Sequence, residues 1–170
     1  FIRWSQAAVF CSHMRYHGIG PREPWAYGAE AEAICREFID LRYQLIPYLQ
    51  TCCRDASETG LPVMRSMVLS FPEEQALHPF DMQYMLGNDI FVAPVFREGG
   101  GVRYRLPMGV WRDLWTGRVR EGGVTVNETM PLNRIPVFAR DGVCLPMGPV
   151  VTHTGELNEA NRIAAYVLYG

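Results

Sequence analysis

Lysine is absent from the 170-residue chain, so all sixteen of its lysine-or-arginine positions are arginine. Basic and acidic residues nearly balance, at 16 against 18, and the formal net charge is −2. The chain therefore has neither the basic surface that attracts nucleic acids nor a long acidic tail, and we expect no nucleic-acid partner. Arginine suits the recognition of hydroxyl and carboxylate groups through its planar fork, but the absence of lysine alone indicates no function.

The sequence also lacks a run of the roughly 18 apolar residues that a membrane span needs, so we expect no membrane partner. The cysteines are odd in number and form no CxxC pair and no Cys/His cluster with zinc spacing. We interpret them as buried free thiols in a reducing cytoplasm. They are Cys11, Cys35, Cys52, Cys53 and Cys144. Because Phe1 follows no initiator methionine, basic region or cleavage site, we expect a fragment of a longer protein.

The clearest periodic element is a helix predicted from residue 29 to 57, in which apolar residues recur at intervals of three and four. Pro47 should kink or split this helix, and Gly60 should end it. The apolar run 63–69 then predicts a buried strand, so that helix, short link and strand are typical of one β/α unit. A short helix is expected between residues 79 and 86.

The sequence pattern changes from Asn88 onward, where short apolar runs alternate with glycine-rich turns. Their spacing of about eight to twelve residues predicts an antiparallel β-sandwich. The runs span residues 90–93, 102–106, 110–115, 124–126 and 135–138. We place the boundary between the two patterns near residue 85. The final run, 164–169, predicts a strand whose partners lie beyond the end of the chain.

Five segments, taken in chain order, carry a family resemblance. They are Arg3-Trp4 with Phe10–Gly18, Pro24–Tyr27, Leu45–Leu49, Gly60–Met67 with Phe71-Pro72, and Gln83–Val95. Together they resemble glycoside hydrolase family 31, and within it the bacterial α-xylosidase branch. Any one of them would be weak evidence, but five in order are specific.

The resemblance implies a fold that is α/β and then all-β, with the C-terminal portion of a (β/α)8 barrel followed by an antiparallel β-sandwich domain. Residues 1–85 would be the last β/α units of the catalytic barrel, with 63–69 as its eighth strand. Residues 86–150 would form the proximal C-terminal β-sandwich. Residues 151–170 would begin a truncated distal β domain.

The resemblance also assigns a sugar-binding residue, His17. In the family the histidine of an Arg-x-His segment lies at the C-terminal end of a barrel strand and hydrogen-bonds hydroxyls of the sugar in the −1 subsite. A neutral imidazole both donates and accepts, and the C-terminal face is where barrel enzymes keep their sites. Without the resemblance, a loop histidine satisfied by backbone would be the better interpretation.

Arg15 is the second candidate for substrate binding. It could orient His17 or neighbouring carboxylates, but it could equally form a structural ion pair beneath the site, and we favour the ion pair. We interpret His13 as structural. Trp25 and Tyr27 could offer an aromatic platform for a sugar, although packing in the core or at a rim is commoner for such residues.

No catalytic residue is assigned in this chain. Retaining glycosidases need two carboxyl groups about 5–5.5 Å apart, and none of the Asp or Glu residues is expected at the end of a barrel strand. In the family both catalytic aspartates lie upstream of the segment that matches Phe1. We therefore expect the fragment alone to be inactive, and the chemistry requires no cofactor, whether metal or organic.

For the intact protein we expect a retaining, exo-acting α-glycosidase whose partner is a carbohydrate with a terminal α-linked sugar. α-Xylosidase is the first choice and α-glucosidase the second, and a homo-oligomer is left open. A rival from another class is a non-catalytic carbohydrate-binding β module. It would use Trp111 and Trp115 as a sugar platform, whereas packing between sheets is the commoner fate of such a pair.

Overall fold

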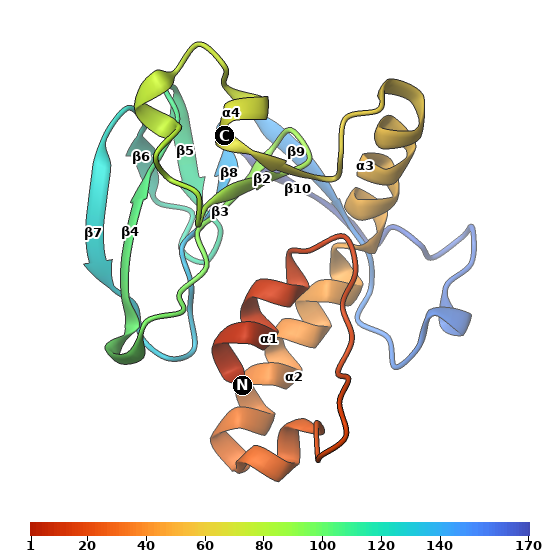
Figure 1. The fold of residues 1–170 in the computed structure, drawn as a ribbon. Coiled ribbons are helices and arrows are strands. Elements are labelled where there is room, and N and C mark those ends of the chain that lie inside the picture. Colours follow the sequence, from red (N-terminus) through yellow and green to blue (C-terminus); the bar gives the residue numbers. More distant parts are fainter.

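A computed structural model describes residues 1–170, with helices in the first third of the chain and strands in most of the rest (Figure 1). The helices are α1 (Ile2–Val9), α2 (Ala29–Gln44), α3 (Ile46–Thr59) and the single turn α4 (Met67–Ser70). The strands are β1 (Met64–Ser66), β2 (Tyr84–Leu86), β3 (Ile90–Val92), β4 (Gly101–Arg105), β5 (Val110–Asp113), β6 (Val119–Glu121), β7 (Thr125–Thr129), β8 (Val137–Arg140), β9 (Val143–Met147) and β10 (Ala165–Tyr169). None of the helices is long and apolar enough to cross a membrane.

The predicted long helix is present and is divided where Pro47 requires. α2 ends at Gln44 and α3 begins at Ile46, which places Pro47 in the first turn of α3, where its missing N–H costs nothing. Gly60 ends α3 in the left-handed conformation, with φ of 75°. The expected split and the expected stop are both confirmed.

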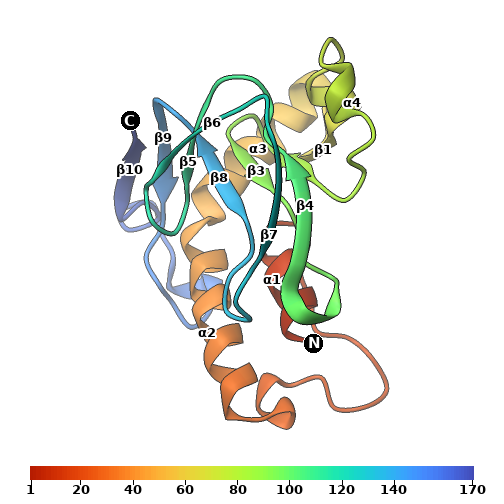
Figure 2. The same cartoon turned by 90° about the vertical axis from the view of Figure 1, so that its left-hand side faces the viewer.

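The central element is a six-stranded antiparallel sheet in the order β1-β2-β3-β8-β5-β6. Paired residues share a face, so Phe91 and Phe138 lie on one side and Ile90 and Ala139 on the other. The Phe91 side forms a core with the separate two-stranded sheet of β4 and β7, whereas the Ile90 side packs against α2 and α3. Figure 2 shows β4 and β7 in front of this sheet and the helices behind it.

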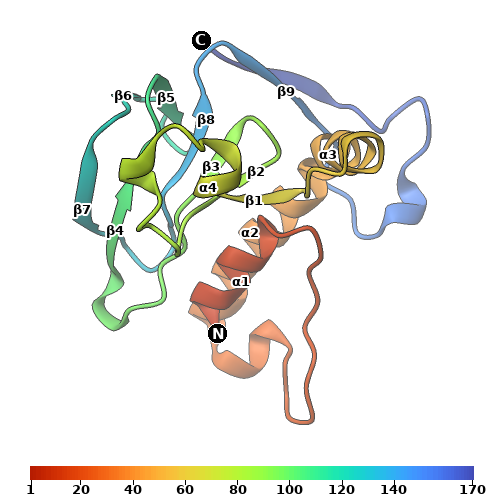
Figure 3. The same cartoon turned by 45° about the horizontal axis from the view of Figure 1, so that its top comes forward.

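The prediction of one strand over residues 63–69 is wrong. Only 64–66 are a strand, and 67–70 turn into α4, which lies beside β1 and β2 (Figure 3). Ser66 ends the strand because its hydroxyl accepts the N–H of Leu69 and caps the helix, 3.4 Å away. β1 pairs antiparallel with β2, so it belongs to the sandwich sheet and is not a strand of a parallel barrel.

The boundary near residue 85 is also misplaced, because it cuts through β2 and would separate β1 from its own sheet. The short helix expected over 79–86 is absent, and the nearest helical turn is a 3₁₀ turn at Gln75–Leu77. The change from a helical to a β-strand sequence pattern is present in the structure. The loop between α4 and β2, however, is too irregular to be assigned from apolar periodicity.

The last strand was predicted to lack a partner inside the chain, and this is wrong. β10 pairs antiparallel with β9 along five residue pairs. That residues 151–170 begin a further β domain stays a prediction. The cysteines are all free, as expected, but Cys53 and Cys144 are exposed and not buried.

Candidate functional site

The segment that carries the predicted sugar ligand, residues 13–17, has no regular secondary structure and belongs to no sheet. Its start is held by Arg42 of α2, whose guanidinium donates to the carbonyls of Val9 (2.8 Å), Cys11 (2.5 Å) and Ser12 (2.9 Å). Desolvation lowers the pKa of Arg42, but an arginine stays charged at neutral pH. One half-buried cation therefore fixes the point at which the segment begins.

The two sides of this segment differ. Met14 and Tyr16 are half-buried and face the helices, whereas His13, Arg15 and His17 are exposed. An extended backbone turns successive side chains to opposite sides, so residues two and four apart point the same way. The alternation thus gathers one arginine and two histidines on the open side, which we call the open face of segment 13–17.

Aromatic stacking fixes the opposite, helix-facing side. The ring of Tyr16 stacks on Phe1 with centroids 5.3 Å apart, and Phe1 stacks in turn on Tyr27 at 3.9 Å. Burial raises the pKa of Tyr16 to about 12, so its hydroxyl stays neutral. Tyr27 therefore serves packing, as the commoner interpretation held.

The predicted site residues His17 and Arg15 lie together on the open face. Neither makes a side-chain hydrogen bond or an ion pair with another residue of this chain, and both roles considered for Arg15 stay predictions. His13 shares this face, and its Nδ1 lies 3.2 Å from the hydroxyl of Ser12. The sugar-binding role of His17 stays a prediction.

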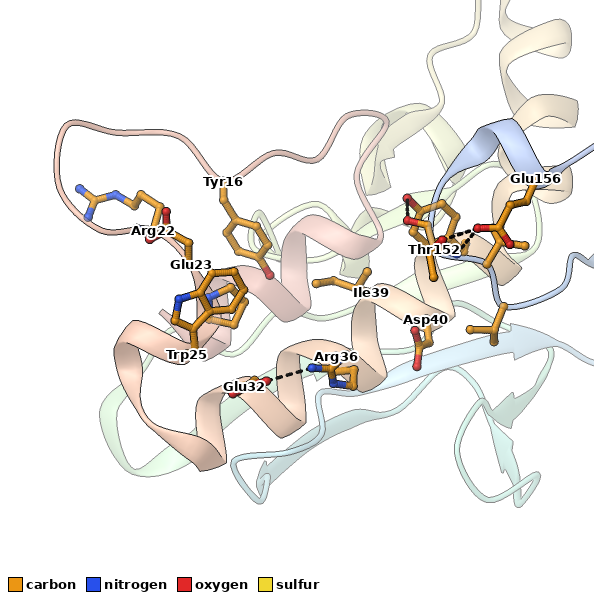
Figure 4. Close-up of a pocket in the computed structure, with 14 residues that line it drawn as sticks. Tyr16, Arg22, Glu23, Trp25, Glu32, Arg36, Ile39, Asp40, Thr152 and Glu156 are labelled. Carbon is orange, nitrogen blue, oxygen red and sulfur yellow. Dashed lines mark hydrogen bonds and ion pairs between the residues drawn. The ribbon is translucent and has the colours of Figure 1, made fainter.

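A cavity with a volume of about 680 Å³ lies on the other side of the segment (Figure 4). It is bounded by Tyr16, the α2 residues Glu32 and Asp40, and Thr152 from the tail. His17 does not line it, because the alternation that brings Tyr16 to the cavity turns His17 away. Trp25 lines the cavity with 65% of its surface exposed, which agrees with the position at a rim considered for it.

The carboxylates of the chain form no catalytic pair at this face. Asp113 accepts three hydrogen bonds in the turn that follows β5, and Asp141 pairs with Arg112 at 2.5 Å. Asp81 is exposed and lies outside any helix. No group of three or more His, Cys, Asp or Glu side chains is arranged to hold a metal ion.

The tryptophans proposed as an accessory sugar platform are both engaged in packing. Trp111 is fully buried, and its indole N–H donates to the carbonyl of Pro107 at 2.8 Å. Trp115 donates to the carbonyl of Ile135 at 2.7 Å and packs on Phe38 at 5.5 Å. The exposed platform that a non-catalytic sugar-binding module would need is therefore absent.

Comparison with known proteins identifies both halves of the chain. The model of the glycosyl hydrolase family 31 TIM-barrel domain matches residues 1–52, and that of the family 31 C-terminal domain matches residues 60–145. The predicted fold class, a barrel portion followed by an antiparallel β domain, is confirmed. The two matches meet between residues 52 and 60, which agrees with the sheet to which β1 belongs.

Individual relatives carry several activities in their names. The chain is 33% identical to alpha-glucosidase 2 of Bacillus thermoamyloliquefaciens over 98% of its length, and 36% identical to an alpha-xylosidase of Saccharolobus solfataricus over 86%. It covers 23% and 20% of those proteins. A solved structure of a Flavobacterium johnsoniae dextranase in complex with isomaltotriose matches with a TM-score of 0.82 and 38% identity, over 88% of this chain and 19% of that one.

The chain thus spans about a fifth of the length of these relatives. The two family models together account for most of its residues, and they follow the same order as its helical and β parts. The chain belongs to glycosyl hydrolase family 31.

Proposed function

We propose that this chain supplies the C-terminal part of a retaining, exo-acting α-glycosidase, with α-xylosidase as its activity. Its substrate would be a carbohydrate with a terminal α-linked sugar. The observation that carries the proposal is the open face of segment 13–17, where His17 and Arg15 stand exposed without any partner inside the chain. Family membership gives that face its meaning. The expected cytoplasmic location stays a prediction.

The chemistry divides between residues inside and outside the chain. Retention needs a nucleophilic carboxylate and an acid/base carboxyl group, and both would come from residues outside 1–170. His17 would accept and donate hydrogen bonds to sugar hydroxyls, and these bonds strengthen as the ring flattens in the transition state. Arg15, two residues earlier on the same face, would donate to a hydroxyl or to a carboxylate beside it. No metal is needed for these steps.

α-Glucosidase activity is the second candidate. The named α-glucosidase from Bacillus aligns with 98% of this chain, against 86% for the named α-xylosidase from Saccharolobus, although the latter is slightly more identical. Xylose lacks the hydroxymethyl group of glucose, so the two sugars differ at one point of the −1 subsite. Aryl α-xyloside and aryl α-glucoside, assayed with the complete enzyme, would separate the two activities.

The site itself is tested by His17→Ala in the complete enzyme. Loss of a hydroxyl ligand that binds most strongly in the transition state should lower kcat/KM about 100-fold. His13→Ala is the matched control on the same open face and should stay within about twofold of the parent. Equal effects of the two substitutions would contradict the role given to His17. The 170-residue chain alone should hydrolyse neither substrate.

A further inference from the structure

A second, smaller cavity lies at the α4 end of the central sheet, away from segment 13–17. Its volume is about 250 Å³. Two arginines from different strands border it, Arg65 of β1 and Arg140 of β8, together with Ser70, Asn88 and Phe71. No part of the proposed glycosidase site contributes to it.

The register of the sheet brings the two arginines to one face. Arg65 pairs with Met85, Met85 with Phe91, and Phe91 with Phe138, so all four residues point to the same side. Arg140 follows Phe138 by two residues on β8 and points to that side as well. α4 lies beside β1 and β2 (Figure 3), and its end and the turn after it contribute Ser70 and Phe71 to the cavity.

Arg65 is a buried cation, with only 5% of its surface exposed. Its Nε donates to the carbonyl of Pro62 at 2.8 Å, and one terminal nitrogen donates to the side-chain oxygen of Asn88. The other terminal nitrogen, Nη2, has no hydrogen-bond partner in the protein. A guanidinium held rigidly in this way still offers donors to a ligand.

Arg140 is held mainly by aromatic rings. Its guanidinium carbon lies 5.0 Å from the ring centre of Trp111 and 5.7 Å from that of Phe71. The one hydrogen bond of the guanidinium to protein is a long contact of 3.4 Å with the carbonyl of Asn88. Stacking of this kind fixes the plane of the guanidinium but leaves most of its N–H groups unused.

The third polar group of the cavity is the hydroxyl of Ser70. Its oxygen is buried and has no hydrogen-bond partner. Orphaned buried hydroxyls are uncommon in folded proteins and call for an explanation such as a bound ion. The hydroxyl borders the same cavity as the two guanidinium groups.

No carboxylate lines the cavity, and neither arginine forms an ion pair within 4.0 Å. The carboxyl of Asp89 lies near both arginines but does not line the cavity, and desolvation raises its pKa. A buried cation without a paired anion is costly. The lining of the cavity therefore holds two cations and several donors but no anion, and the nearest carboxyl, that of Asp89, lies outside it.

We propose that this cavity binds a small tetrahedral oxyanion of the phosphate or sulfate class. Arg65 Nη2, the guanidinium of Arg140 and the hydroxyl of Ser70 would each donate to its oxygens, and guanidinium groups match phosphate geometry well. The proposal does not depend on the glycosidase activity, since no residue is shared between the two sites.

The test is titration of the full chain with inorganic phosphate at constant ionic strength, followed by the NMR signals of the Trp111 indole N–H and the arginine Nε–H groups. Saturable shifts are expected. Arg140→Gln should weaken binding about tenfold or more, because it removes a charged donor. Arg118→Gln, at an exposed arginine without a side-chain partner, is the matched control and should leave the affinity unchanged.

Ser70→Ala separates binding from folding. Because the hydroxyl has no partner in the protein, its removal should leave the unfolding midpoint unchanged or raise it slightly, while phosphate binding weakens about threefold to tenfold. Sulfate should compete with phosphate. Non-saturating shifts, equal losses in Arg118→Gln and Arg140→Gln, or tighter binding of acetate than of phosphate would each overturn the proposal.

Discussion

Segment 13–17 and strand β3 are both short, non-helical stretches of the chain, but they have opposite surroundings. β3 is bonded on one edge to β2 and on the other to β8, and its three residues are fully buried. Segment 13–17 has no strand on either edge, and every second side chain is exposed. Where the backbone of a strand is hydrogen-bonded to neighbouring strands on both edges, its side chains form part of a core. Where both edges are open, polar side chains remain free for a ligand.

The largest effect is expected at Gly87, where the six-stranded sheet packs against α3. A methyl group on Gly87 would lie 2.5 Å from Sγ of Cys52 and 2.6 Å from the hydroxyl oxygen of Tyr48, both on α3. Gly87 also has φ of 61°, which disfavours a side chain. Gly87→Ala should therefore lower the free energy of unfolding by about 3 kcal/mol, measured by urea denaturation.

Gly60→Ala is the matched control for this change. Gly60 has a similar φ of 75°, but nothing lies within 4 Å of the position a methyl group would take. It should cost only about 1 kcal/mol, the strain of the left-handed backbone. Equal losses in both variants would mean that the contact of α3 with the sheet contributes nothing, and that the two regions are less closely joined than the structure indicates.

The second test concerns the anchor of the open segment. Arg42→Met removes the donor to three carbonyls and should cost about 2 kcal/mol, with a larger effect on local order around residues 9–12 than on the sheet. Hydrogen exchange read residue by residue would check this. Arg54→Met, at an exposed arginine of α3 with a single 3.5 Å contact, should change neither quantity. Uniform destabilisation of the sheet by Arg42→Met would remove the distinction between the two regions.

The smallest expected effect is a pH dependence of the folding stability, caused by Asp89 between β2 and β3. Desolvation raises the pKa of Asp89 above its ordinary value of 3.8, so above that value the folded chain holds a proton that the unfolded chain has lost. Stability should then fall as pH rises through the raised pKa. The Asp89→Asn variant has no carboxyl group at this position, so its stability should not fall in this way. Its free energy of unfolding relative to that of the parent should therefore rise from acid toward neutral pH. A constant difference across urea denaturations from acid to neutral pH would rule this out.

Much of the local structure could be predicted from the sequence. Pro47 and Gly60 act through their own backbone chemistry, so the division and the end of the long helix needed no tertiary information. The run 63–69 failed because a short apolar stretch fits a buried strand or a helix equally well, and the choice was made by the cap at Ser66 and by pairing with β2.

The candidate site was predictable only in part. The family resemblance pointed to His17 and Arg15, but placing them on one face depends on the alternating exposure along residues 13–17. The second cavity gave no signal in the sequence. Arg65 and Arg140 are 75 positions apart, and only strand order and register put them on the same face.

The sequence by itself determined the element types near strong backbone signals, the change from a helical to a β-strand sequence pattern, and the family. Those properties follow from local sterics, from apolar periodicity and from ordered motifs. The tertiary structure alone decided which strands pair, which side chains of segment 13–17 are exposed, and which two arginines line one cavity that no carboxylate lines. Pairing and burial depend on contacts between residues far apart in the chain, and these are set by the fold as a whole.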